Sequence, residues 1–78
     1  YKLRKEQAKE ERMRKSRINK IESEIAFLED KIVEIEKALS SPEIAGDYEK
    51  LFQNTAELDD TKTALDALYE EWEELSML

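Results

Sequence analysis

A stripe of apolar residues with coiled-coil spacing runs through the first half of the chain. Its members recur at alternating intervals of three and four residues, and they are Ile18, Ile21, Ile25, Leu28, Ile32, Ile35 and Leu39. This spacing is the a/d pattern by which one helix packs along another. A second apolar stripe, between residues 48 and 75, follows a short break that holds the only proline and the only glycine. The sequence therefore predicts an all-α fold in which two long helices form an antiparallel coiled-coil hairpin.

The break between the two stripes contains residues that suit a tight connection between helices. Pro42 ends the first helix near residue 39, and Ser41 with Pro42 favours the start of a one-turn helix. We expect Gly46 to adopt a left-handed backbone and Asp47 to cap the second helix. The predicted hairpin thus occupies residues 18–78, with a turn at 40–47 and the second helix at about 48–77.

The second stripe is less regular than the first. At the same spacing, the second stripe places eight residues in the seam between the two helices. They are Tyr48, Leu51, Thr55, Leu58, Lys62, Leu65, Tyr69 and Trp72, and Phe52, Leu68 and Leu75 lie beside them. A turn centred on residues 43 and 44 gives these facing pairs: Leu39 with Tyr48, Ile32 with Thr55, Ile25 with Lys62, Ile18 with Tyr69, and Arg14 or Arg17 with Trp72. We expect Lys62 to carry its ammonium to Glu22 or Glu29, and Trp72 to make a cation–π contact with its arginine.

Charge is divided unevenly along the chain, whose net charge is −7. Residues 1–17 hold eight basic and three acidic side chains, a balance of +5, whereas the remaining 61 residues carry −12. This basic N-terminal segment is expected to continue the first helix, and it favours contact with nucleic-acid phosphates. The candidate residues for that contact are Arg4, Lys5, Lys9, Arg12, Arg14, Lys15 and Arg17. A solvated helix supported by its own Glu10–Arg14 and Glu11–Lys15 pairs is the open alternative.

Several functions require residues that the chain lacks. Without Cys or His there is no disulfide, thiolate or imidazole chemistry, and no glycine-rich phosphate loop is present. We expect no catalytic residue and no cofactor in this domain. The acidic residues Glu70, Glu71, Glu73 and Glu74 radiate from one helix, so we expect a solvated face and no metal site. No apolar run approaches the roughly 20 residues that span a bilayer, and we expect a cytoplasmic protein without membrane contact.

The order of motifs along the chain resembles a known family. The motifs are Lys5-Glu6-Gln7, the stripe from Ile21-Glu22 to Leu28-Glu29, Ser41-Pro42-Glu43, Asp47-Tyr48-Glu49-Lys50-Leu51, and Leu68-Tyr69-Glu70-Glu71-Trp72-Glu73-Glu74-Leu75. Together they resemble the C-terminal coiled-coil domain of ATP-binding cassette F (ABC-F) proteins of the Uup type. The start at Tyr1, with an abrupt charge pattern, also leads us to expect a part of a larger protein.

The resemblance implies an accessory role for the domain. It implies two tandem ATPase domains in the same chain, which bind ATP, and weak contact with DNA or ribosomal RNA through the basic candidates without sequence preference. A protein-docking or spacer coiled coil without a nucleic-acid role is the alternative. From the residues we expect a monomer or a weak dimer, because Phe27, Phe52 and Leu68 are left partly uncovered by a two-helix seam.

Overall fold

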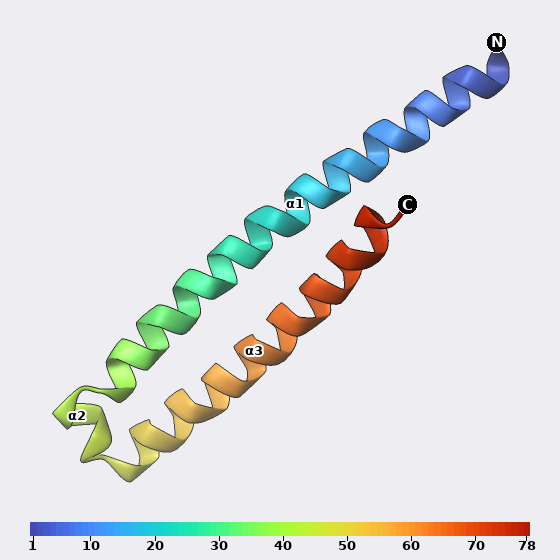
Figure 1. The fold of residues 1–78 in the computed structure, drawn as a ribbon. Helices are drawn as coiled ribbons and strands as arrows, with labels where there is room; N and C mark the ends of the chain where they lie inside the picture. Colours follow the sequence, from blue (N-terminus) through green and yellow to red (C-terminus); the bar gives the residue numbers. More distant parts are fainter.

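The computed structural model describes all 78 residues and contains three helices. Helix α1 spans Lys2–Leu39, α2 spans Pro42–Ala45, and α3 spans Tyr48–Ser76. Helices α1 and α3 run antiparallel side by side, and α2 joins them at one end (Figure 1). The molecule measures 66 × 15 × 14 Å, the shape of two packed helices with no further layer. The predicted all-α antiparallel hairpin is confirmed.

The apolar stripe of α1 forms one side of the seam between α1 and α3. Ile21 is fully buried, and Ile25 and Ile35 are 7% and 6% exposed. The remaining members, Ile18, Leu28, Ile32 and Leu39, are half-buried. A two-helix seam is open on both sides, so only side chains that point straight at the other helix lose all contact with water. The seven stripe residues predicted for the first helix are therefore confirmed.

The contribution of α3 to the seam differs from the prediction at every second position. The buried and half-buried residues that recur at intervals of three and four are Leu51, Asn54, Leu58, Thr61, Leu65, Leu68, Trp72 and Leu75. The prediction was wrong for Tyr48, Thr55, Lys62 and Tyr69, which are exposed. Thr61 is 5% exposed and donates its hydroxyl to the carbonyl oxygen of Glu57 at 2.7 Å. Because its one donor is satisfied within the helix, Thr61 can be buried where the ammonium of Lys62 could not.

The connection follows the predicted cap chemistry, with one exception. Pro42 is the first residue of α2, and the Asp47 carboxylate accepts a hydrogen bond from the backbone N–H of Lys50 at 3.2 Å at the start of α3. The expected left-handed backbone at Gly46 is wrong, since its φ is −84° and its ψ is −5°. A Cβ at this position would lie 3.1 Å from the carbonyl oxygen of Pro42, so a larger residue requires a small shift of that backbone.

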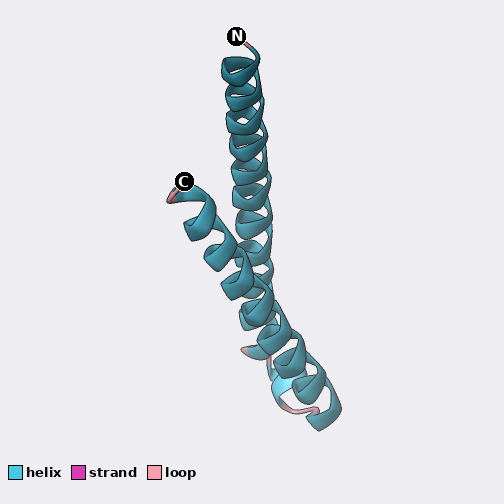
Figure 2. Cartoon of the chain, turned by 90° about the vertical axis from the view of Figure 1, so that its right-hand side faces the viewer, coloured by secondary structure: helices cyan, strands magenta, loops and turns pink.

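The N-terminal part of α1 extends past the end of α3. Residues 1–13 are all exposed, and we call them the overhang. Both views show α1 continuing as a single helix beyond the C-terminal end of α3 (Figures 1 and 2). In Figure 2, α3 leans away from α1 toward its C-terminal end. The overhang is therefore a rod with every side accessible in this chain.

The corrected seam can be tested at two neighbouring residues. Thr61→Val removes a buried hydroxyl that bonds only to its own helix, and we expect the free energy of unfolding to rise by about 0.5–1 kcal/mol. Lys62→Ala changes an exposed position and should shift it by less than about 0.5 kcal/mol. Urea unfolding of both variants measures this. If the free energy of unfolding rose in Lys62→Ala and not in Thr61→Val, the seam predicted from the sequence would be the correct one.

Candidate nucleic-acid interface

Four basic side chains lie on one face of the overhang. Lys2, Lys5, Lys9 and Arg12 recur at intervals of three and four residues, and with Glu6 they line a shallow depression of about 260 Å³. We call these four residues the basic stripe. They span eleven residues, so the first and last lie about 15 Å apart along the helix axis. None of the four takes part in a salt bridge, so the face presents its positive charge to solvent.

The other predicted candidates do not join the basic stripe. Arg4 is exposed on another side of α1, and Lys15 is paired with Glu11 one helical turn away at 3.4 Å. Arg14 and Arg17 are half-buried, because the helical rotation turns both toward α3. The structure thus brings Lys5, Lys9 and Arg12 together and separates the remaining four.

Lys2 belongs to the basic stripe although it is not among the seven candidates predicted from the sequence. The signal was present in the spacing, since positions 2, 5, 9 and 12 share one helical face in the same way as an apolar a/d stripe. The charge balance of residues 1–17 as a whole does not show which cations share a helical face.

Arg17 connects the two helices. Its guanidinium donates from Nε to Glu71 Oε1 at 2.9 Å and from Nη2 to Glu71 Oε2 at 3.0 Å. This two-bond geometry fixes both side chains more firmly than a single contact would. A second inter-helix salt bridge joins Lys31 and Glu57 at 3.3 Å. Both pairs agree with the predicted facing positions to within one residue.

Trp72 makes a contact that was not predicted from the sequence. Its indole N–H donates a hydrogen bond to Glu22 Oε1 at 3.1 Å across the seam. The prediction for Lys62 is wrong, because it is exposed and Glu22 is engaged by the indole. One helical turn before Trp72 on α3, partial desolvation of the Tyr69 phenol raises the pKa of Tyr69. The negative charge and hydrogen bond of Glu29 act in the same direction.

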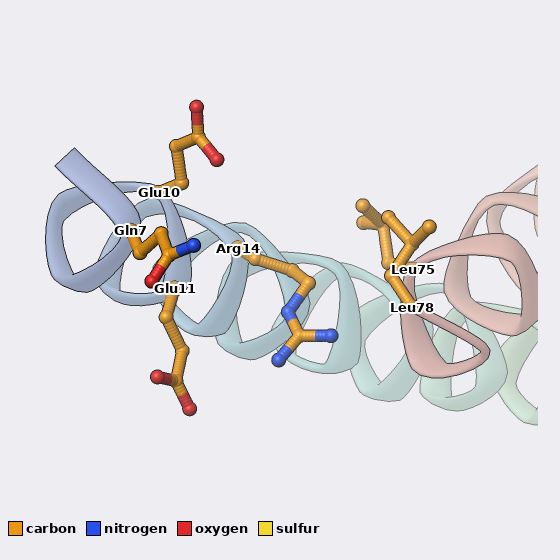
Figure 3. A pocket seen from close by; sticks show the side chains of 6 residues that line it. All are labelled: Gln7, Glu10, Glu11, Arg14, Leu75 and Leu78. Atoms are coloured by element: carbon orange, nitrogen blue, oxygen red, sulfur yellow. The ribbon is translucent and has the colours of Figure 1, made fainter. Parts of the chain in front are cut away.

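A wider depression lies where α3 ends against the overhang. It measures about 470 Å³ and is lined by Gln7, Glu10, Glu11, Arg14, Leu75 and Leu78. Figure 3 shows Arg14 extending along α1 toward the end of α3, while Glu10 and Glu11 project to opposite sides of the helix. Arg14 is therefore surrounded by acidic and apolar side chains, in contrast to the open setting of the basic stripe.

Two further structural features bear on function. No set of three acidic side chains converges in the way that a metal ion requires. None of the helices combines the length and apolar character needed to cross a membrane. The basic stripe is a concentrated and accessible cluster of cations.

Comparison with known proteins gives one match. Residues 9–77 match the model of a family described as "ABC transporter C-terminal domain". No curated protein and no solved structure matches the chain. The matched range includes Lys9 and Arg12 of the basic stripe, all of α2 and all of α3.

The Arg17–Glu71 salt bridge should contribute measurably to stability. Each side chain is about two-fifths exposed, so solvent screening limits the coupling energy to about 0.5–1 kcal/mol. A double-mutant cycle with Arg17→Ala and Glu71→Ala, measured by urea unfolding, gives this value. The exposed Lys37–Glu34 pair is the control and should give less than about 0.5 kcal/mol. Equal coupling in the two cycles would contradict a special role for Arg17.

The Tyr69–Glu29 contact predicts a change in stability at alkaline pH. A raised pKa means that the folded state favours the neutral phenol. The stability that is linked to the neutral phenol is complete below the pKa of about 10 in the unfolded state. It is lost as the pH rises through the higher pKa of the folded state. Urea unfolding across this range should show a steeper fall for the parent chain than for Tyr69→Phe. Parallel curves for the two proteins would refute the contact.

Proposed function

The chain belongs to the ABC transporter C-terminal domain family, so it is an accessory, non-catalytic domain of an ABC protein, and we propose that it contacts nucleic-acid phosphates through the basic stripe. We further propose that the parent protein is a cytoplasmic ABC-F protein. ATP would bind in two tandem ATPase domains of that parent protein. The motif order that includes Ser41-Pro42-Glu43 supports this choice of family branch.

The observation that carries the proposal is the geometry of the basic stripe. Its four cations lie within about 15 Å on one helical face, and none is neutralised by a salt bridge. A cation that neutralises a phosphate releases a counterion, which makes the contact favourable and sensitive to salt. An exposed helix with cations on one face can lie against a phosphate backbone without further rearrangement.

The remaining charges favour the overhang over the hairpin as the point of contact. Residues 18–78 carry −12 and repel a polyanion. Tyr1 is the only aromatic residue of the overhang, so base stacking contributes little there. Contacts made through phosphates alone do not distinguish sequences. We therefore propose binding to DNA or ribosomal RNA without sequence preference, and weak binding by this domain alone.

A salt series with labelled duplex DNA and with structured RNA tests the proposal. If the four stripe residues each neutralise a phosphate, the logarithm of affinity should fall with the logarithm of salt concentration with a slope of about −3 to −4. The double variant Lys5→Gln/Lys9→Gln should reduce that slope by about 2 and weaken binding at least about tenfold at low salt. The preferred polymer identifies the target.

The matched control removes the same charge elsewhere. Lys20→Gln/Lys62→Gln changes two exposed lysines that make no salt bridge, and affinity should stay close to that of the parent chain. Circular dichroism confirms that each variant keeps its helices. Equal losses in the two double variants would show that only net charge matters. Absence of binding at low salt would favour the protein-docking or spacer role.

A further inference from the structure

A shallow apolar depression lies on one side of the hairpin. It measures about 420 Å³ and is lined by Glu24, Phe27, Leu28, Ala64, Ala67, Leu68 and Glu71. Along both helices it falls between the two inter-helix salt bridges, Arg17–Glu71 and Lys31–Glu57. Five of the seven lining residues are apolar, and Phe27 at its edge is 68% exposed. The seam thus leaves apolar surface open at this point.

The rim of the depression is acidic. Glu71 is held by Arg17, whereas the half-buried Glu24 takes part in no salt bridge. The adjoining stretches 22–30 and 66–74 together contain nine acidic residues and no basic residue. A ligand that fits must therefore bring an apolar side chain to the floor and positive charge to the rim.

The chain itself contains one segment with this chemistry. In the overhang, Leu3 and Met13 are 67% and 63% exposed, and Lys5, Lys9 and Arg12 of the basic stripe lie between them in sequence. We propose that two copies of the chain associate, with the overhang of each copy seated in the depression of the other. The charge complementarity between overhang and rim supports a second copy as the occupant.

Two-fold symmetry allows the contact to form twice. The middle of the overhang and the middle of the depression are separated by about 19 residues of α1, roughly 28 Å at 1.5 Å per residue. A two-fold axis midway between them sets the α1 helices of the two copies antiparallel. Each overhang then meets the depression of the other copy, which is the self-complementary arrangement of a closed dimer. The proposed dimer is therefore closed, and the contact does not lead to longer chains of copies.

This association uses the charges that nucleic acid would also use. A contact that depends on exposed charges weakens as salt is added. Nucleic acid and the second copy should therefore compete for the basic stripe. The association itself does not depend on nucleic-acid binding, since the depression and its acidic rim are features of the hairpin alone.

Sedimentation equilibrium of the intact chain tests the proposal. We expect a monomer–dimer equilibrium at low salt that shifts to monomer at high salt. Ala64→Lys places bulk and positive charge in the depression, and it should weaken the dimer at least about tenfold. Ala56→Lys makes the same change on α3 outside the depression and should leave the dimer intact. Both alanines are exposed, so helical content should not change. Phe27→Gln, on α1, is a second variant of the depression and should also weaken the dimer.

Three results would overturn this inference. One is a chain that stays monomeric at every concentration in low salt. Another is a dimer that Ala64→Lys and Ala56→Lys affect equally, which would place the interface elsewhere. The third is a dimer lost in Ala64→Lys but unchanged in Lys5→Gln/Lys9→Gln, which would exclude the overhang as occupant. Ala64→Lys should not weaken binding to DNA or RNA, so failure here is distinguishable from failure of the proposed function.

Discussion

The narrow seam between α1 and α3 is the contact on which the rest of the molecule depends. Only Ile21, Ile25, Ile35 and Thr61 are buried, so hydrophobic stabilisation comes from a single line of side chains. Because α1 has 38 residues and α3 has 29, the seam ends before α1 does. A free helix as short as the overhang is marginal in water. The overhang is helical because it continues a helix that the seam already holds.

The sequence was sufficient to predict α1 but only half of the α3 face. In α1, seven large aliphatic residues mark one face without interruption, and their apolar neighbours Phe27 and Val33 do not form a second stripe at the same spacing. In α3, the spine of Leu51, Leu58, Leu65 and Trp72 fits two seams that differ by one residue at every second position. Thr61 is less costly to bury than Lys62, but a polar threonine does not by itself mark a seam position. Tyr69 and Leu68 are both large enough to fill the seam. Only the direction of the facing helix decides, and that information is not local to α3.

The candidate site shows the same division between composition and direction. The excess of positive charge in residues 1–17 can be counted from the sequence, but which cations remain free depends on packing. Arg17 forms a salt bridge with Glu71 because that glutamate faces it across the seam. Trp72 donates its indole N–H to Glu22 on α1, a pairing that also depends on how the two helices pack. A basic residue near the end of a hairpin is therefore either free or engaged in a structural contact, according to its helical angle.

The separation of charge along the rod determines how an anionic partner can approach. A polyanion meets repulsion along residues 18–78 and attraction at the overhang, so its favourable position lies at one end of the molecule. The acidic hairpin of a second copy is itself an anionic partner, and it adds an apolar depression that phosphates lack. Salt screens both contacts, but the apolar part of the second is not screened. Rising salt should therefore weaken the proposed nucleic-acid contact more steeply than the proposed self-association, and this difference in slope distinguishes the two proposals.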